Sequence, residues 1–239
     1  MWKVRTQVPQ GEEDVGEDVG AVREPAPEVL AAFEAARGFM PRDEGLALHA
    51  AAVEAAGLGL PLLEIGSYCG RSTLLLADAA RAAGTVVVTV DHHRGSEEQQ
   101  PGQEYSDPEL VDPERPERMD TLPHFRRTLA ASGLEAHVVA AVGASPVVAR
   151  AFGGNGGGLF GLVFVDGGHT EEHARADYDS WVPALAVGGL LAIHDVFPDP
   201  ADGGQAPYHV WTRALASGAF AEVGGERSLR VLRRVAPGH

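Results

Sequence analysis

A single cysteine, Cys69, is present among 239 residues, so the chain has no second thiol with which to form an internal disulfide. Disulfides are typical of oxidising compartments, and nothing in the sequence indicates one. The chain also lacks any apolar run near the ~20 residues that cross a membrane, and its N-terminus lacks the basic-then-apolar pattern of a signal peptide. These absences predict a cytoplasmic protein that does not enter a membrane.

Positive charge is scarce as well. The chain carries 19 Lys and Arg residues against 34 Asp and Glu residues, which gives a formal net charge of −15. A phosphate backbone would be repelled by such a surface, and no run of Lys and Arg forms a local basic patch. The composition therefore predicts that the protein does not bind nucleic acid.

The length of the chain suits one domain with a complete core, whereas two full domains would be cramped. Residues 1–24 are polar and acidic with few large apolar side chains, which predicts a disordered tail or an arm that a partner orders. From Pro27 onward, apolar residues recur at helical spacing and predict two amphipathic helices. We therefore expect an acidic tail over 1–24 and a single domain over 25–239.

Short apolar runs alternate with helical patterns through the rest of the chain. This alternation predicts an α/β fold with a mostly parallel sheet covered by helices on both faces. The last two strands follow one another across Gly224-Gly225 and predict a closing antiparallel hairpin. Seven strands are expected, at 62–65, 86–90, 137–142, 161–165, 190–193, 220–223 and 228–233. Helices are expected between them at 72–83, 122–131, 146–152, 171–185 and 210–217.

Two segments interrupt this alternation. Residues 153–158 read Gly-Gly-Asn-Gly-Gly-Gly and predict a flexible connector. Residues 92–120 form a long polar insertion with nine acidic residues between Ser96 and Asp120. A loop this long is usually a lid, a binding loop or a disordered excursion. Because it leaves the carboxyl end of a central strand, where open α/β sheets bind ligands, we expect it to close over a ligand.

The strongest functional signal is the segment 63–73, Leu-Glu-Ile-Gly-Ser-Tyr-Cys-Gly-Arg-Ser-Thr. A buried strand runs into a turn that carries Gly66 and Gly70, and the turn opens a helix. Glycines let the backbone approach a ligand closely, and the free N–H groups of a helix start favour a carboxylate or phosphate. The spacing is not the Gly-x-Gly-x-x-Gly of dinucleotide-binding proteins, which disfavours NAD. An ordinary tight turn between strand and helix is the alternative.

An acidic residue, Asp91, directly follows the second strand. An acid at this place, some 20 residues or more beyond a glycine turn, is positioned to accept hydrogen bonds from ribose hydroxyls. The alternative is an aspartate that caps the next segment. Together, the turn and Asp91 indicate a cofactor that contains adenosine.

These motifs resemble those of class I S-adenosylmethionine-dependent methyltransferases, and residues 64–72 look most like the catechol O-methyltransferase group. The resemblance covers residues 40 to 235 and implies a Rossmann-like, doubly wound fold. It implies that the glycine turn surrounds the methionine part of the cofactor, that Asp91 holds the ribose with His92 beside it, and that Gly143-Ala144-Ser145 lies against the adenine. The expected cofactor-binding residues are Glu64, Gly66, Ser67, Tyr68, Gly70, Ser72, Asp91, His92, Ala144, Ser145 and Asp166.

The expected catalytic residues lie in Val165-Asp166-Gly167-Gly168-His169, at the end of the fourth strand. In the catechol-type enzymes, the residue that matches Asp166 binds a divalent cation, and a lysine three residues later takes the proton of the substrate hydroxyl. This chain has His169 there, which titrates near neutral pH and can act as a general base. A histidine that only packs at a helix start is the alternative.

A further motif, Ile193-His194-Asp195, ends the fifth strand, where the catechol-type enzymes carry two metal ligands. Asp166, His194 and Asp195 are therefore candidate ligands for Mg²⁺ or Mn²⁺. Mg²⁺ prefers oxygen ligands, whereas a histidine favours other metals or none, so metal dependence stays open. Sugar and macrolide O-methyltransferases of natural-product pathways resemble this pattern more closely.

The sequence thus predicts an S-adenosylmethionine-dependent O-methyltransferase acting on a hydroxyl of a small molecule, in secondary metabolism. Two alternatives are an N-methyltransferase of a small amine and a catalytically inactive cofactor-binding protein that serves as a regulatory or scaffold subunit. A homodimer is the expected oligomeric state.

Overall fold

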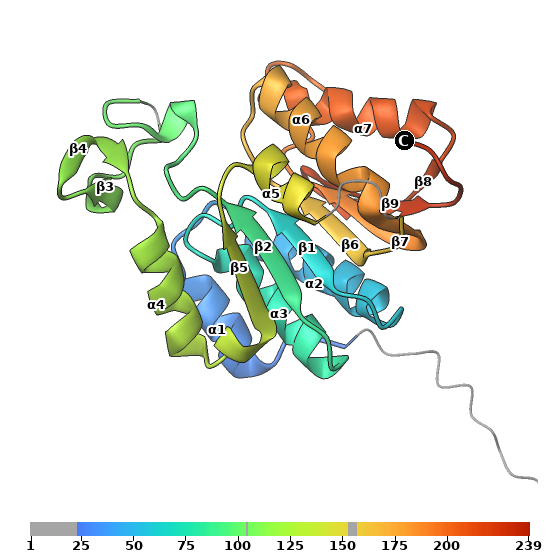
Figure 1. Ribbon diagram of the computed structural model, residues 1–239, viewed down its shortest axis with the longest axis horizontal. Coiled ribbons are helices and arrows are strands. Elements are labelled where there is room, and N and C mark those ends of the chain that lie inside the picture. The colour runs from blue at the N-terminus through green and yellow to red at the C-terminus, as the bar shows by residue number, and fades with distance from the viewer. Residues whose placement is uncertain (1–22, 104, 153–156) are drawn as a thin grey trace, which may run out of the picture.

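The computed structural model describes residues 23–103, 105–152 and 157–239. The predicted tail lies outside the described residues apart from Arg23 and Glu24, and so does most of the glycine-rich connector. The chain forms one seven-stranded sheet in the order β5-β2-β1-β6-β7-β9-β8, with a separate two-stranded ribbon, β3-β4 (Figure 1). From the central strands β1 and β6, the strand order proceeds toward opposite edges of the sheet. Open α/β sheets bind ligands at the point where the strand order reverses in this way.

The strands of the main sheet are β1 (Leu62–Ile65), β2 (Val87–Asp91), β5 (Val138–Val142), β6 (Phe160–Val165), β7 (Leu185–Ile193), β8 (Phe220–Glu226) and β9 (Leu229–Arg234). The helices are α1 (Pro27–Ala35), α2 (Arg42–Ala56), α3 (Arg71–Ala82), α4 (Leu122–Ser132), α5 (Ser145–Ala151), α6 (Glu171–Trp181) and α7 (Ala206–Ala216).

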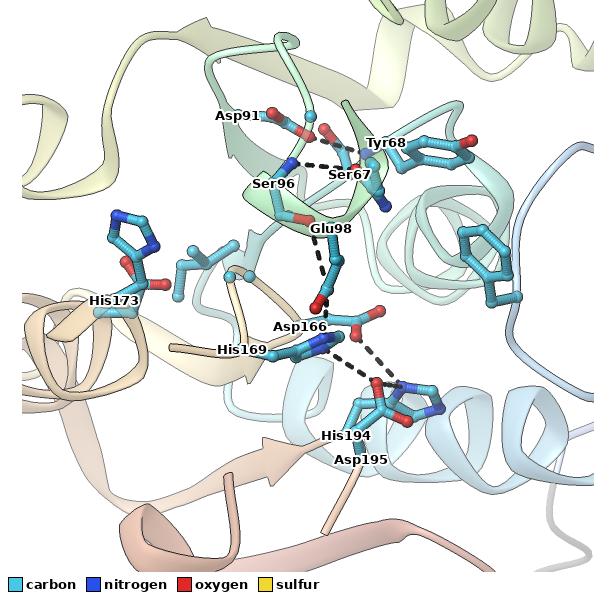
Figure 2. Close-up of a pocket in the computed structure, with 18 of the residues that line it drawn as sticks. Ser67, Tyr68, Asp91, Ser96, Glu98, Asp166, His169, His173, His194 and Asp195 are labelled. Atoms are coloured by element: carbon cyan, nitrogen blue, oxygen red, sulfur yellow. Dashed lines mark hydrogen bonds and ion pairs between the residues drawn. The ribbon is translucent and has the colours of Figure 1, made fainter. Parts of the chain in front are cut away.

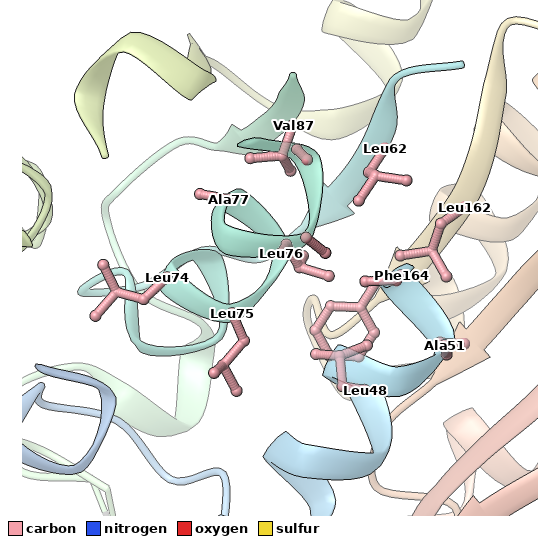
Figure 3. Close-up of a cluster of buried hydrophobic side chains, with 14 of the residues drawn as sticks. Leu48, Ala51, Leu62, Leu74, Leu75, Leu76, Ala77, Val87, Leu162 and Phe164 are labelled. Atoms are coloured by element: carbon pink, nitrogen blue, oxygen red, sulfur yellow. The ribbon is translucent and has the colours of Figure 1, made fainter. Parts of the chain in front are cut away.

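Helices cover both faces of the sheet. Helices α1 to α4 pack on one face, where Leu62, Leu162 and Phe164 of the strands meet Leu48 and Leu75 of the helices (Figure 3). Helices α5, α6 and α7 cover the other face over a second core. Alternate residues of β1 enter the two cores, and all four are buried, as expected for a strand enclosed on both sides.

The strands β5, β2, β1, β6 and β7 run parallel to one another, and β9 and β8 are added as an antiparallel hairpin. The predicted fold class is therefore confirmed. The hairpin turns at Arg227-Ser228 instead of the predicted Gly224-Gly225, because β8 continues through the glycines after a register shift between Glu222 and Gly224. In the part of the chain that the structure describes, none of the helices is both long and apolar enough to cross a membrane.

The predicted helix over 171–185 is wrong at its end. It stops at Trp181 and is followed by a short 3₁₀ helix, η4 (Val182–Ala184). Pro183 has no backbone N–H with which to continue the α-helical bonding pattern. The fifth strand of the sequence prediction starts earlier than expected, at Leu185, and pairs with Phe160 of β6.

In the residues that the structure describes, the insertion over 92–120 is an ordered element. It contains two 3₁₀ helices, η1 (Glu97–Gln99) and η2 (Pro108–Leu110), and the ribbon β3 (Val111–Asp112) with β4 (Arg115–Met119). Its two ends meet where His93 contacts Thr121, through a backbone bond of 3.1 Å and a side-chain bond of 2.8 Å. Leu110 and Met119 pack on Cys69, which lies within the glycine turn, so the insertion is anchored to the turn after β1.

Candidate active site

A cavity of about 660 Å³ lies at the carboxyl ends of the parallel strands, between the sheet and the insertion. The residues that follow β1, β2, β5, β6 and β7 form its floor. Its outer wall comes from the connector between α1 and α2 and from residues 95–100 and Tyr105 of the insertion. The predicted site thus corresponds to one continuous cavity.

The glycine turn after β1 requires its first glycine. Gly66 has a φ of 88°, and a Cβ at this position would overlap the backbone carbonyl oxygen of Asp166 at the end of β6. The absence of a side chain lets the ends of β1 and β6 lie in contact. Both residues line the cavity.

Nine of the eleven predicted cofactor residues line the cavity; Glu64 and Gly70 do not. Gly70 instead caps α3 with a φ of 90° and faces Phe125 of α4. The lining set is Gly66, Ser67, Tyr68, Ser72, Asp91, His92, Ala144, Ser145 and Asp166.

Glu64 is fully buried below the turn, on the α3 side of the sheet. Its two carboxyl oxygens accept hydrogen bonds from the hydroxyls of Ser72 and Thr73, at 2.6 and 2.5 Å. Burial raises the pKa of Glu64 to about 8, although the two hydroxyls oppose this shift, so the group is protonated at neutral pH. Its position supports a role in fixing the start of α3, and a direct contact with the cofactor is not supported.

The carboxylate of Asp91 accepts hydrogen bonds from the backbone after β1 and after β2. One oxygen accepts the N–H of Tyr68 at 2.8 Å, and the other accepts the N–H of His93 at 2.7 Å. Three non-glycine residues at this edge have a left-handed backbone: Tyr68, His93 and Asp195, with φ of 46°, 56° and 56°. Such conformations are costly and cluster at functional sites, where the surrounding contacts maintain them.

His194 is buried between three carboxylates. Its Nε2 lies 2.8 Å from Glu44 of α2. Its Nδ1 lies 3.2 Å from Asp166 and 3.3 Å from Asp195 (Figure 2). Burial lowers the pKa of His194, but the charge of Asp166 and the contacts with all three carboxylates raise it well above its usual range. Glu44 also accepts two bonds of 2.7 Å from the N–H and hydroxyl of Ser228, which ties α2 to the terminal hairpin.

His169 faces the cavity between Asp195, which it shares with His194, and a further carboxylate, Glu98. Its Nδ1 lies 2.7 Å from Glu98 of the insertion, and its Nε2 lies 3.1 Å from Asp195 (Figure 2). The close contact with Asp195 and the charges of Asp195, Glu98 and Asp166 raise the pKa of His169 to about 9, against the effect of burial. The predicted pair Asp166 and His169 is thus brought together with Asp195 on one side of the cavity.

The donor atoms here suit a divalent cation. Asp166, His169 and Asp195 each offer one atom, and these atoms lie within 4.8 Å of one another. The Nδ1 of His194 is buried, makes no aligned hydrogen bond and faces both carboxylates, while Glu44 holds its other nitrogen. A carboxylate on the outer nitrogen is the usual support of a metal-binding histidine. Of the predicted ligands, Asp166 and Asp195 belong to this group together with His169, and His194 lies beside both carboxylates.

Sequence reasoning did not find several residues of the site. Asp177 of α6 is buried against Gly167, lines the cavity, and has a pKa that burial raises to about 6. Phe39 and Tyr105 form an aromatic rim with the predicted residue Tyr68; the ring centroids of Tyr68 and Tyr105 lie 5.6 and 5.9 Å from that of Phe39. Glu44 and Glu98 are two further additions. Among these residues, Phe39 carried a signal, since it is a large aromatic residue in the short connector between two predicted helices.

A family model of methyltransferase domains matches residues 63–196, more than half of the chain. The chain belongs to this family. The match begins in β1 and ends just after Asp195, so it covers the turn, Asp91 and both strand-end motifs of this methyltransferase. The family that the sequence predicted is confirmed.

Solved structures share the fold at low sequence identity. The O-methyltransferase from Bacillus cereus in complex with S-adenosylhomocysteine is 15% identical, with a TM-score of 0.55 over 87% of this chain and 89% of that one. The O-methyltransferase NovP is 15% identical, with a TM-score of 0.60 over 82% and 81%. TomG from Streptomyces achromogenes, an O-methyltransferase of tomaymycin synthesis in complex with S-adenosylmethionine, is 16% identical, with a TM-score of 0.56 over 90% and 92%.

Proposed function

We propose that this methyltransferase transfers the methyl group of S-adenosylmethionine to a hydroxyl of a small molecule. The observation that carries the proposal is His169, which faces the cavity opposite the glycine turn and is held by carboxylates. The three solved structures above are O-methyltransferases, and two contain this cofactor or its product.

The cofactor half of the cavity is the part lined by the turn after β1, by Asp91 and His92, and by Ala144-Ser145. Gly66, Ser67 and Tyr68 would surround the methionine part, since the left-handed turn brings them to the wall of the cavity. Asp91 would accept the ribose hydroxyls, since a carboxylate oxygen can accept further bonds beside its backbone N–H. Asp177 would face the adenine side, because it lies in the cavity near Ser145.

In the transfer, a bond forms from the acceptor oxygen to the methyl carbon, and the bond from that carbon to sulfur breaks with its electron pair moving to sulfur. The acceptor proton passes to His169. Because the sulfonium already activates the methyl group, the protein mainly aligns the acceptor and removes this proton. The positive sulfonium in the same cavity also favours the neutral imidazole, which is the form that accepts a proton.

Asp166 and Asp195, with His194, would hold a divalent cation beside the base His169, and a bound cation would polarise the acceptor oxygen as a Lewis acid. Calorimetric titration of the protein with Mg²⁺ and Mn²⁺ tests this directly. The titration is repeated on Asp195→Ala, in which binding is expected to disappear. Full activity in excess chelator, together with no heat of binding, would leave both carboxylates with orienting roles only.

The acceptor half of the cavity is lined by the aromatic rim and by acidic residues that include Glu97, Glu98 and Asp202. The rim supports an acceptor with an apolar or aromatic body. The acidic lining favours a second candidate, an amine acceptor, because a protonated amine would be attracted to it. Turnover of labelled cofactor against phenol, catechol, a hexose glycoside, benzylamine and an amino sugar separates hydroxyl from amine transfer.

Absence of any turnover in that panel, with S-adenosylhomocysteine bound, would support the catalytically inactive alternative. Failure to bind S-adenosylhomocysteine would overturn the proposed function as a whole. A role in secondary metabolism and a homodimeric state remain proposals, of which the second is checked by light scattering in solution.

A further inference from the structure

Glu98 extends from the insertion across the cavity to His169 (Figure 2). The two residues are 71 positions apart in the chain, and their contact of 2.7 Å is the shorter of the two that the imidazole makes with carboxylates. Both side chains are about one-third exposed, at 35% and 34%. A hydrogen bond of this length to a charged acceptor belongs to the stronger kind.

The backbone of the insertion fixes the position of Glu98. Ser96 and Gln99 form a capping box around the short helix η1, in which the Ser96 N–H donates to the Gln99 side chain at 3.1 Å. The Ser96 hydroxyl donates to the Glu98 carboxylate at 3.2 Å, and the Tyr105 N–H donates to the Glu98 carbonyl at 3.1 Å. Glu98 is therefore held at its carboxylate and at its backbone, unlike a side chain on an unstructured rim.

Both nitrogens of His169 face a carboxylate, but only the Nδ1 contact with Glu98 is an aligned hydrogen bond, and this difference assigns their roles. A carboxylate on Nδ1 keeps that nitrogen protonated and directs the lone pair of a neutral ring to Nε2. Nε2 lies 3.1 Å from Asp195, at the strand ends that form the floor of the cavity. An acceptor hydroxyl that enters between Nε2 and Asp195 would find a nitrogen that can take its proton.

We propose that Glu98 is a positioning residue for the base: it holds the Nδ1–H of His169 so that Nε2 faces the acceptor. This inference depends on the proposed role of His169. The insertion then does more than cover the acceptor, because it delivers the carboxylate that completes the base. Glu98 takes no proton in the reaction, and its contribution is the tautomer and orientation of the ring.

A double-mutant cycle tests the inference, with the hydroxyl acceptor that gives the highest turnover in the panel above. Glu98→Ala is expected to lower kcat roughly 10–100-fold, as is usual for a residue that orients an active group, while the KM for the acceptor stays nearly constant. Glu98→Gln should recover part of the rate, because its amide oxygen still accepts the Nδ1–H. In the His169→Ala background, Glu98→Ala should have no further effect on kcat. Glu114→Gln, at an exposed acidic residue of the same insertion outside the cavity, is the matched control.

A measurement without substrate supports the kinetics. A downfield imidazole N–H signal in the ¹H NMR spectrum, assigned by its loss in His169→Ala, should disappear in Glu98→Ala and persist in Glu114→Gln. Its absence from the unmodified protein would overturn the inference.

Three kinetic outcomes would also overturn it. They are an equal rate loss from Glu98→Ala in both backgrounds, a raised KM with unchanged kcat, and a gain in rate that would mark Glu98 as an obstacle. If His169→Ala keeps the full rate, the base assignment itself fails. If only His169→Ala is inactive and Glu98→Ala equals the unmodified protein, the inference fails while the proposed function stands.

Discussion

Glu44 and His194 are 150 residues apart in the chain and share a buried contact of 2.8 Å below the cavity. Removing the carboxylate would leave a buried imidazole facing Asp166 and Asp195 without its third partner. We expect Glu44→Ala to lower the free energy of unfolding by about 3–5 kcal/mol, measured by urea denaturation. Glu54→Ala, which breaks an exposed ion pair with Arg233, should cost about 1 kcal/mol or less.

Glu44 also makes the free energy of unfolding depend on pH. Burial raises the pKa of Glu44, but hydrogen bonds from His194 and Ser228 outweigh it, so the pKa lies below the ordinary 4.5. A carboxyl with a depressed pKa stabilises the fold above its unfolded pKa, and this contribution is lost as pH falls below 4.5. The difference in unfolding free energy between the unmodified protein and Glu44→Gln should shrink over that acidic range. A difference in unfolding free energy that stays constant with pH would contradict the contact between Glu44 and His194.

Glu64 predicts the opposite pH dependence. Its pKa is raised from 4.5 to about 8, so the folded state keeps a proton that the unfolded state releases. Stability should therefore fall as pH rises from 4.5 to about 8, with a slope of up to ~1.4 kcal/mol per pH unit from this one group. Glu64→Gln keeps the hydrogen-bonding shape without the charge, and should remove this slope in thermal or urea unfolding at several pH values. A slope that persists in the variant would have to come from other groups.

Gly66 and Gly84 form a matched pair. Both have positive φ, at 88° and 69°, but a Cβ at Gly84 would meet nothing within 4 Å, whereas one at Gly66 would overlap Asp166. Gly84→Ala should cost only ~1–2 kcal/mol for the left-handed backbone. Gly66→Ala should destabilise the protein more and should also weaken the binding of S-adenosylhomocysteine, since β1 and β6 must separate at the cavity. Equal effects of the two variants would show that the close approach is not required.

Asp91→Ala should weaken binding of S-adenosylhomocysteine by about 1.5–3 kcal/mol, the range of charge-assisted hydrogen bonds. Isothermal titration calorimetry measures the affinity. Because Asp91 also holds the N–H groups of Tyr68 and His93, Asp91→Asn serves as the milder variant that keeps one acceptor oxygen. Unchanged affinity in both variants would remove Asp91 from the cofactor site.

His169→Ala should lower the methyl-transfer rate roughly 10²–10⁴-fold, the usual span for a general base, with cofactor affinity nearly unchanged. The carboxylates around the ring raise its pKa to about 9, so the neutral base becomes more abundant as pH rises. The rate of the unmodified protein should therefore rise with pH toward that value, and this limb should be missing in the variant. A variant that keeps the rate and the profile would make His169 structural.

Local patterns predicted the framework of the protein and most of the cavity floor. Strand ends in a parallel sheet meet at one edge, so Gly66, Asp91, Asp166 and Asp195 could be placed together before the structure was known. Residues whose role depends on tertiary contacts between distant parts of the chain could not be found in this way. Glu98 lies on an insertion with no periodic pattern, and its partner is 71 positions away.

Other differences arise where one residue competes with a longer pattern. The apolar spacing predicted a helix to residue 185, but the helix ends at Trp181, just before Pro183. Gly224-Gly225 suggested the hairpin turn, but the glycines lie within β8 and Arg227 takes the left-handed position. Glu64 was expected to contact the cofactor because of its motif. It follows Leu63 in a strand whose side chains alternate between two faces, and its own face is the one covered by α3.

The contact between His93 and Thr121 has a consequence for how this enzyme could change its substrates. The chain leaves β2 and enters α4 through neighbouring residues, so the whole segment between them can be exchanged as one cassette without lengthening or shortening the framework. Such an exchange would replace much of the acceptor-facing wall in one event and leave the floor formed by β1 and β2 intact. Grafting the corresponding segments of related enzymes onto this framework would redirect its choice of acceptor while retaining its methyl donor.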